Sequence, residues 1–494
     1  MSKYQNPYEA KIGADRLNSP VPIIALLLFV AIAVFLIDNS GLAAGVGLLM
    51  LPFILTYLIF FFKYPVVGFY STIVLGYILL GSARYVKLGQ IGLAMDGILV
   101  MTYLALIFNR FRDRIDWTPA KKDITLLGAI WFGYAMFQAV NPESRSLAAW
   151  MSGMRGISMY MFLMIPLALL LIDTRKKLDI FFIIWGLMAL LATTKGIMQM
   201  TLGVDKFEKA WLDAGGAVTH ILFGKLRVFS FMSDAGQFGA NQGYSAVVAL
   251  IIAFAEKKRL KFRLFFGLVA IMGLYGMIIS GTRGAISVPL GGAILYFIHR
   301  KNKYVMISGA IVMIMGFIFF KYTTIGQDNQ QIRRMRSAFD PNDASLQVRL
   351  ANQKKLKIYL ASRPFGGGIG HAGVKAQKYL PNAFLSNVAT DSWYVLIWAE
   401  QGIVGLLLHL FILFYVIIRS SYLIMFRIRD PIVRLKMSAM ASGMFGVMIA
   451  SYGNAVLGTM PTGMLIYTSM ALLLSPEKFD VEAFPGEKQE LKES

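Results

Sequence analysis

Cysteine is absent from the 494-residue chain. Its absence excludes disulfide bonds, thiolate metal sites and a cysteine nucleophile. Histidine is rare, and none of the four residues has the spacing of a metal site such as His-Glu-x-x-His. The chain also lacks a Walker phosphate-binding loop with its lysine. We therefore expect neither a metal ion nor a cofactor.

Charged residues are scarce as well, at 15% of the chain against 57% hydrophobic residues. The mean hydropathy is +0.60, which is far from that of a soluble domain. Apolar residues occur in runs of about 18–25, long enough to cross a bilayer as helices. This composition excludes a soluble enzyme, a disordered protein and a coiled coil. An outer-membrane barrel is excluded too, because its strands would alternate with period two.

The apolar runs predict an all-α polytopic membrane protein with about 12–14 transmembrane helices. The first run lies late and lacks a small-residue cleavage site, so we interpret it as a retained helix rather than a signal peptide. The predicted spans are 21–37, 42–62, 64–81, 89–108, 123–140, 154–172, 178–201, 235–255, 264–281, 283–300, 304–320, 392–418, 434–454 and 457–475.

Short basic loops alternate with the apolar runs and indicate the orientation. All of them fall on one side if the N-terminus is inside the cell, so the positive-inside rule places both termini in the cytoplasm. This role, with contacts to lipid headgroups, accounts for most of the net charge of +22 without nucleic acid. The basic loops lie at 109–114, 174–177, 256–259, 299–303 and 427–436.

Two long segments, 203–234 and 321–390, are predicted to lie on the opposite, outer face. The second is strongly basic, with 11 Lys and Arg residues, and a loop of its length largely escapes the positive-inside rule. An anionic ligand on the outer face would explain these cations; contact with anionic headgroups or lipopolysaccharide is the alternative. Neither segment contains an Asp-x-Asp pair for a metal-bound nucleotide sugar, so a nucleotide donor is not expected.

Two arginines stand out near the outer surface. Arg283 lies in the turn 280–284 between two apolar runs, where a cation is costly unless it faces water, protein or an anion. Its planar fork suits a pair of phosphate oxygens, and a snorkelling interfacial arginine is the alternative. Arg227 precedes a helix start rich in amides and glycine, at 228–242. Such polar residues either line a cavity or join helices through amide hydrogen bonds.

The long outer loop carries one predicted short helix. Asp343 can cap a helix that begins near Ala344, and the dipeptide Arg363-Pro364 ends it. Arg349 lies on this helix. The glycine-rich stretch 366–370 that follows is flexible enough for its backbone to approach a phosphate closely.

Acidic residues suggest two further features. Asp391 lies at the outer mouth of a span, with Glu400 about 13 Å deeper on helical rise, and can accept the proton of an attacking hydroxyl. Asp391 can equally be an N-cap, and the two roles are compatible. Asp96 and Lys195 each lie about 10 Å below the outer surface. Their equal depth and opposite charge predict an intramembrane ion pair, with a relay or substrate site as the alternative.

The order of these features resembles the bacterial O-antigen ligase family and its relatives, the O-antigen and exopolysaccharide polymerases. In that family a His followed by Asn, Ser or Gln precedes nine residues, a Gly, two residues and Gly, Thr or Tyr. Here Asp391-Ser392 is followed by nine residues and then Gly402 and Gly405, so only the first position departs. The segment 280–284 is similar to the family's Ser-x-Ser-Arg-Gly signature. Arg349 with the segment 363–368 resembles a further family stretch, and the resemblance covers roughly residues 225–420.

The resemblance implies transfer of a glycan from undecaprenyl pyrophosphate to an acceptor sugar hydroxyl at the periplasmic face, without a metal. It assigns catalysis to Asp391 and Arg283, and pyrophosphate binding to Arg227, Arg283, Arg349 and Arg363. Structural roles are implied for Ser392, Gly402, Gly405, Gly366 and Gly368. The implied domains are a cytoplasmic segment 1–20, transmembrane helices 21–201, a ligase-like core 202–420 with periplasmic loop 321–391, helices 421–475 and a cytoplasmic tail 476–494.

Because Asp391 replaces the ligase histidine, the acceptor is either a lipid A-core-like glycan or, as in a polymerase, another lipid-linked glycan. His371 and His220 also lie on the predicted outer face, but nothing in their spacing supports a catalytic role. A polysaccharide flippase without catalysis is the alternative class. The absence of a convincing internal repeat disfavours a transporter.

Overall fold

The computed structural model describes residues 41–85, 92–109, 115–222, 224–328, 330–337, 340 and 342–480, with scattered positions between 20 and 38. The predicted N-terminal segment, most of the span at 21–37, the basic residues 110–114 and the tail beyond 480 lie outside the described residues. The chain divides into two compact units, Met1–Tyr64 and Pro65–Ser494. The first contains the 22-residue apolar helix α3 (Leu42–Lys63), whose last turn is basic.

The second unit is a bundle of long apolar helices. Across both units, ten of the described helices are long and apolar enough to cross a membrane, as expected for an all-α polytopic membrane protein. The long helices of the second unit are α4 (Pro65–Ser82), α5 (Gly92–Asn109), α6 (Asp123–Phe137), α8 (Tyr160–Leu171), α9 (Arg175–Thr201), α12 (Ala235–Ala255), α13 (Leu260–Ile279), α14 (Ser287–Arg300), α15 (Lys303–Tyr322), α18 (Trp393–Tyr422), α19 (Pro431–Ala450) and α20 (Thr462–Leu473).

Two predicted spans are shorter in the structure. The run 283–300 begins with a 3₁₀ turn, η5 (Arg283–Ile286), so α14 has only 14 residues. The run 457–475 contributes α20, which has 12 residues. At 1.5 Å per residue, neither helix alone spans a hydrocarbon core of about 30 Å.

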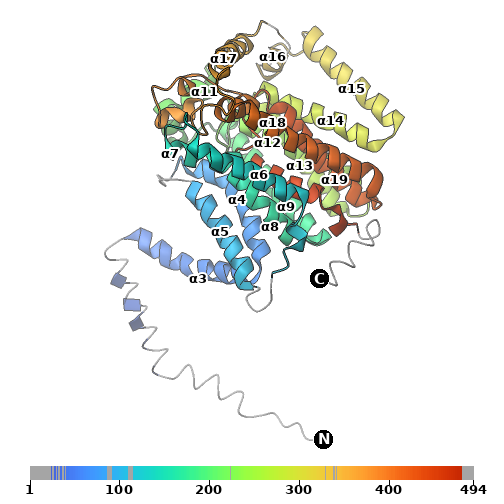
Figure 1. Ribbon diagram of the computed structural model, residues 1–494. Helices are drawn as coiled ribbons and strands as arrows, with labels where there is room; N and C mark the ends of the chain where they lie inside the picture. The colour runs from blue at the N-terminus through green and yellow to red at the C-terminus, as the bar shows by residue number, and fades with distance from the viewer. Residues whose placement is uncertain are drawn as a thin grey trace. The chain divides into compact units, whose positions relative to one another are not determined.

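Helix α12 forms the centre of this bundle and packs against α13, α14 and α19 (Figure 1). Small residues on α12 permit this close packing. A side chain added at Gly239 would overlap the Ser280 hydroxyl, and one added at Gly243 would lie 3.2 Å from Val288 Cβ. This core holds the ends of α13 and η5 in place, and Arg283 with them.

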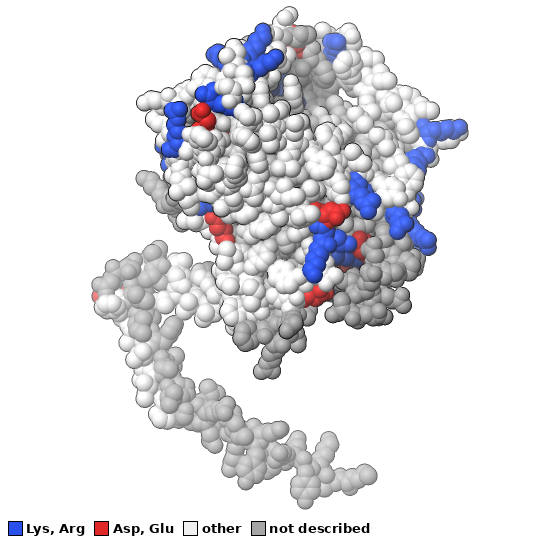
Figure 2. Space-filling model, viewed as in Figure 1, with Lys and Arg blue, Asp and Glu red and all other residues white. Residues whose placement is uncertain are grey.

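The loops fall into two groups at opposite ends of the helices. In one group Asp179, Arg259, Glu256 and Lys436 form a single ion-pair network, and Arg175 contacts Asp430. These residues come from loops predicted to lie on the cytoplasmic side. The space-filling view shows charged residues gathered at the two ends, with a largely uncharged surface between them (Figure 2).

The other end carries short helices and irregular segments from both long outer loops (Figure 1). The first loop contains α10 (Lys206–Trp211), α11 (Ala217–His220) and the small antiparallel pair β1 (Ile221–Leu222) and β2 (Lys225–Leu226). The second contains α16 (Gln330–Arg336) and α17 (Ala344–Leu360). The predicted Asp343 cap is confirmed, since its side chain accepts from Leu346 N at 3.1 Å. A separate apolar cluster that includes Leu356, Leu360 and Ala399 fixes α17 on α18.

Candidate functional site

Arg227 and Arg283 meet at the turn between α13 and α14. Arg227 Nη2 donates to Thr282 Oγ1 at 3.2 Å, so it contacts the residue next to Arg283. Its Nη1 donates to Thr219 O at 3.2 Å. Its Nε is buried and has no hydrogen-bond partner within the part of the chain that the structure describes. Two arginines that were predicted separately therefore share one site.

Arg283 contacts the start of α17. Its Nη1 lies 2.5 Å from Asp343 Oδ2 and 2.9 Å from Ser337 Oγ. The Arg283 side chain is 26% exposed, so part of it remains accessible from solvent while it is paired. The neighbouring Arg283 guanidinium keeps the pKa of the Asp343 carboxyl below its usual value. This ion pair joins the 280–284 turn to the long outer loop.

A third cation, Arg334 on α16, increases the positive charge at this site. A side chain added at Gly281 would lie 2.9 Å from Arg334 Nη1, so this guanidinium lies against the same turn. Burial and the nearby Arg334 charge lower the pKa of Arg227 to about 10, which still leaves it protonated at neutral pH. Burial and Arg283 likewise lower the pKa of Arg334. Crowded, partly desolvated cations of this kind favour binding of an anion.

Arg349 and Asp391 form the adjacent part of the site. Arg349 Nε lies 3.4 Å from Asp391 Oδ2, with the two side chains 32% and 46% exposed. The alternative role of Asp391 as an N-cap is wrong. Ser392 caps α18 instead, and its hydroxyl also donates to Ser451 O at 3.2 Å. Asp391 itself lies just before the cap, with a left-handed φ of 28°, and its carboxylate contacts Arg349.

The segment 453–454, which follows α19, lies between Arg283 and Arg349. A side chain added at Gly284, next to Arg283, would overlap Asn454. One added at Gly453 would lie 3.8 Å from Arg349 Nη1. Arg283 and Arg349 thus border the same short segment. We call Arg227, Arg283, Arg334 and Arg349 the arginine cluster.

Arg363 is not part of the arginine cluster. It lies beyond the C-terminal end of α17, and the helix alone places that end roughly 16 Å from Arg349. Its Nε contacts Glu143 Oε1 at 2.9 Å and its guanidinium lies 4.2 Å from the Tyr359 ring centroid. These contacts attach the end of α17 to the loop before α7 (Leu147–Met154). The structure therefore does not bring Arg363 together with the other arginines, and its part in pyrophosphate binding stays a prediction.

The glycine-rich stretch after Pro364 packs against a kink in α18 and does not form a free phosphate loop. Gly367 N donates to Ala399 O and Gly368 N donates to Glu400 O, both at 2.9 Å. The kink is at Gly402, whose φ is 67°. A side chain added at Gly402 would overlap Pro364 O, and one added at Gly366 would overlap Gly402 N.

Two more glycines to which the family resemblance gives a structural role, Gly368 and Gly405, lie in this packed region. Gly368 has a φ of 95°, and a side chain there would lie 3.0 Å from Ser144 Cα. A side chain at Gly405 would overlap Gln401 and lie 3.0 Å from the Tyr134 ring. The glycines of the motif thus allow backbone segments to meet closely.

The amide-rich start of α12 joins helices through hydrogen bonds. Gln237 donates to Thr459 O at 2.8 Å and to Thr462 Oγ1 at 2.9 Å, and Asn241 donates to Thr462 Oγ1 at 3.2 Å. Gln242 Oε1 accepts from the Thr193 hydroxyl at 3.0 Å. These bonds connect α12 to α20 and α9, so the alternative of amide-bonded packing is confirmed.

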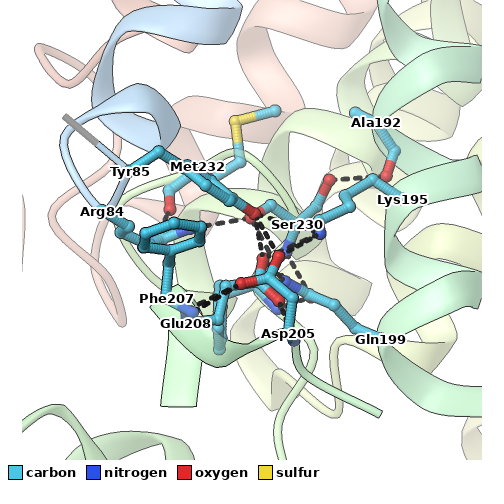
Figure 3. Close-up of polar contacts among 11 residues, drawn as sticks. Arg84, Tyr85, Ala192, Lys195, Gln199, Asp205, Phe207, Glu208, Ser230 and Met232 are labelled. Carbon is cyan, nitrogen blue, oxygen red and sulfur yellow. Dashed lines mark hydrogen bonds and ion pairs between the residues drawn. The ribbon is translucent and has the colours of Figure 1, made fainter. Parts of the chain in front are cut away.

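The predicted ion pair between Asp96 and Lys195 is wrong. Asp96 pairs with Arg155 Nε at 2.8 Å. Lys195 instead contacts Asp205 at 3.2 Å and Glu208 at 3.1 Å (Figure 3). Depth along the chain was predicted from helical rise, but which helix faces which depends on tertiary packing. In the bundle α5 packs against α4 and α8, whereas α9 packs against α4, α12 and α13.

The polar network around Lys195 was not found from the sequence, and it positions the segment that leads to α12. Gln199 Oε1 accepts from Ser230 N at 2.8 Å, and Arg84 donates to Ser230 O at 2.9 Å and also to Met232 O (Figure 3). The Arg84 guanidinium lies 4.5 Å from the Trp211 ring and 4.4 Å from the Phe229 ring. Arg227 begins the segment that these contacts hold.

Neither outer histidine has the surroundings of a catalytic base. His371 is 3% exposed, and its Nε2 accepts from Ser146 N at 3.2 Å while Nδ1 contacts Ile369 O at 2.8 Å. His220 is buried between Trp211 and Phe229. Burial lowers the pKa of both imidazoles. Within the described ranges, no group of three His, Asp or Glu residues could hold a metal ion.

Residues 267–410 match the model of the family described as O-antigen ligase. The match begins within α13 and ends within α18, so it includes Arg283, Arg349 and Asp391. It supports assignment to the O-antigen ligase and polymerase family, and with it a glycosyltransferase-like membrane enzyme. No curated protein and no solved structure matches the chain.

Proposed function

We propose that this member of the O-antigen ligase and polymerase family transfers a glycan from undecaprenyl pyrophosphate to a sugar hydroxyl at the outer face of the bacterial inner membrane. The observation that carries the proposal is the arginine cluster. Its four cations come from four segments of the chain, and one of them, Arg349, contacts the exposed carboxylate of Asp391.

In this proposal the arginine cluster binds the donor pyrophosphate. Arg227 and Arg334 are crowded by like charges, and a phosphate would relieve that repulsion. The Arg283 guanidinium would exchange its contact with Asp343 for one with a phosphate oxygen, or would donate to both groups. Where such a donor stabilises charge that develops in the transition state, removing it lowers the rate by about 10²–10³.

The reaction needs no further reactant. The acceptor hydroxyl oxygen forms a bond to the anomeric carbon of the donor glycan, and the bond from that carbon to the pyrophosphate oxygen breaks. The pyrophosphate leaves with the bonding electrons, stabilised by the arginine cluster. Asp391 accepts the hydroxyl proton, a step that contributes about 10²–10⁴ in such reactions. Arg349 orients the Asp391 carboxylate through the 3.4 Å contact.

The test is a reconstitution in vesicles. Purified protein is mixed with a short oligosaccharide on undecaprenyl pyrophosphate, with and without a lipid A-core acceptor, and the products are sized on a gel. Arg283→Ala is the inactive control, and Lys354→Ala is the matched control from the same loop, because Lys354 is exposed on α17.

We expect new glycosidic bonds with the native protein and with Lys354→Ala, and none with Arg283→Ala. A ladder of longer lipid-linked chains without acceptor identifies a polymerase, and a single addition that requires acceptor identifies a ligase. If the glycan changes leaflet and no bond forms, the protein is a carrier and the proposal fails.

A further inference from the structure

A cavity of about 630 Å³ lies among the outer ends of the helices. Its volume is within the range of about 300–1,000 Å³ that is typical of small-ligand sites. The walls come from α7 and the turn after it, from the start of α18, from the 3₁₀ turn η7 (Val374–Lys378) and from the segment 455–460. Ser233 and Ala455 line it, and their neighbours Asp234 and Asn454 adjoin Gly236. Asn454 also borders Gly284, so the cavity lies close to Arg283.

The charged residues that line this cavity are mostly cations. Arg155, Lys375 and Lys378 face a single carboxylate, Glu400. Arg155 is balanced by its pair with Asp96 at 2.8 Å. Lys375 and Lys378 are exposed, and neither has an ion-pair partner within 4.0 Å among the described residues. Lys375 lies near enough to Glu400 for an electrostatic interaction. The rim therefore carries an excess of positive charge that the protein itself does not neutralise.

The interior of the cavity suits a ligand with many hydroxyl groups. Glu400 is 3% exposed, and its Oε1 accepts from Ala372 N at 3.2 Å. Its Oε2 has no hydrogen-bond partner in the part of the chain that is described, so it can accept from a hydroxyl donor. The Trp393 ring is fixed by its 2.9 Å bond to His409 and lies in the wall. Aromatic faces with a few hydrogen-bonding groups are the usual lining of ligand sites.

The cavity wall is rigid where α7 meets the loop after Gly368. A side chain added at Gly153 would lie 2.8 Å from Gly370 N, which shows direct contact between two backbones. A preformed wall loses little entropy when it binds a ligand.

We propose that this cavity binds the acceptor, and that the acceptor is an acidic saccharide. Its acidic group contacts Lys375 and Lys378 at the rim, and its hydroxyls donate to Glu400. The inference rests on the proposed function, because it identifies the substrate class of the same transfer. Trp393 in the cavity wall is two residues from Asp391 in the chain, so an acceptor bound here would lie near the proposed base.

The test measures binding and needs no turnover, so it succeeds or fails independently of the transfer reaction. The full-length protein in detergent is titrated with trigalacturonic acid and with its uncharged methyl ester, which has the same sugar rings. Variants are the double change Lys375→Ala/Lys378→Ala and the control Lys354→Ala/Lys355→Ala, which removes two exposed lysines of the same outer loop.

We expect the acid to bind at least about tenfold more tightly than the ester, the effect of one charge-assisted hydrogen bond. The Lys375/Lys378 double variant should abolish this difference, and the control pair should preserve it. Equal binding of acid and ester, or an equal loss in the control pair, would overturn the inference. Lysine-dependent displacement of the acid by undecaprenyl monophosphate would also overturn it, because the cavity would then hold the donor lipid.

Discussion

Arg283 is held by Asp343, and this contact allows its catalytic and structural roles to be separated. Arg283→Ala removes the cation, so we expect transfer to fall by about 10²–10³, as for loss of one preorganised donor. Asp343→Asn removes the counter-charge, but the new residue can still cap α17 through its side-chain oxygen. The cation remains available in that variant, so its rate should stay within a few-fold of the native rate.

The comparison uses initial rates of glycan transfer and protein abundance in the membrane for both variants. Equal losses in Arg283→Ala and Asp343→Asn would mean that the ion pair merely holds the loop. Arg283→Lys should recover part of the activity, because an ammonium keeps the charge but lacks the planar fork.

Asp391 can be tested without disturbing its helix, because Ser392 provides the cap of α18. If Asp391 accepts the acceptor proton, Asp391→Ala should lower kcat by about 10²–10⁴. Asp391→His should retain activity, since an imidazole can take the same proton. Steady-state kinetics with the lipid-linked donor measure both. Unchanged rates in Asp391→Ala would remove this residue from the chemistry.

Individual cations were predicted from the sequence because an arginine next to an apolar run is costly. That argument identified Arg283, and the polar helix start that follows Arg227 identified Arg227, which donates to Thr282 beside Arg283. Neither argument could identify Arg334, because it lies in a polar loop among several other cations and no pattern distinguishes it from them. The sequence also could not show that Arg363 lies apart from Arg227, Arg283 and Arg349, because its partner Glu143 is 220 residues away.

The kink in α18 depends on a single glycine. Gly402 has a left-handed φ of 67°, and any side chain would overlap the Pro364 carbonyl. We expect Gly402→Ala to lower the free energy of unfolding by at least about 1–3 kcal/mol. Thermal unfolding in detergent measures this change. Gly267→Ala is the matched control, because an added side chain there meets nothing within 4 Å. A control as unstable as Gly402→Ala would contradict the role of the kink.

The network around Lys195 predicts a second effect on stability. Glu208 is 1% exposed and relies on Lys195 Nζ at 3.1 Å and Gln199 Nε2 at 2.8 Å. Lys195→Met leaves this carboxylate without its counter-charge, so we expect a loss of about 1–3 kcal/mol. Lys195→Met/Glu208→Gln should recover part of it. Thermal unfolding provides the measurement, with exposed Lys209→Met as the control. A single variant as stable as the control would show that the network is dispensable.

The residue ranges of the helices were predicted more accurately than the helices against which each one packs. Hydrophobic run length determines whether a segment can span the bilayer, so the long helices α9 and α12 lie close to their predicted ranges. Partners depend on side-chain packing between segments far apart in the sequence. The Asp96–Lys195 pair therefore failed, whereas the Asp343 cap succeeded because a cap depends on residues three positions apart.

At the scale of the whole molecule, the alternation of basic loops predicted which segments share an end. The ion pairs among Asp179, Arg259 and Lys436 lie in loops assigned to one side, and the contact between Arg283 and Asp343 lies in loops assigned to the other. What the sequence could not provide was the fit between the two long outer loops, because no periodicity describes irregular backbone. The arginine cluster and the cavity both depend on that fit.

The orientation of the bundle in the membrane remains a prediction that the lack of cysteine makes easy to test. Lys354→Cys and Lys258→Cys each introduce the sole cysteine of the chain, and both lysines are exposed. With the arginine cluster on the periplasmic face, a membrane-impermeant maleimide should label Lys354→Cys in cells with a permeabilised outer membrane.

Lys258→Cys should react only after the inner membrane is broken, and the cysteine-free protein should not react at all. The opposite pattern would place the arginine cluster in the cytoplasm. A lipid-linked glycan presented on the outer leaflet could not reach it there, since a pyrophosphate cannot cross hydrocarbon without a large desolvation cost. The proposed transfer would then have to be abandoned, whatever the family match implies.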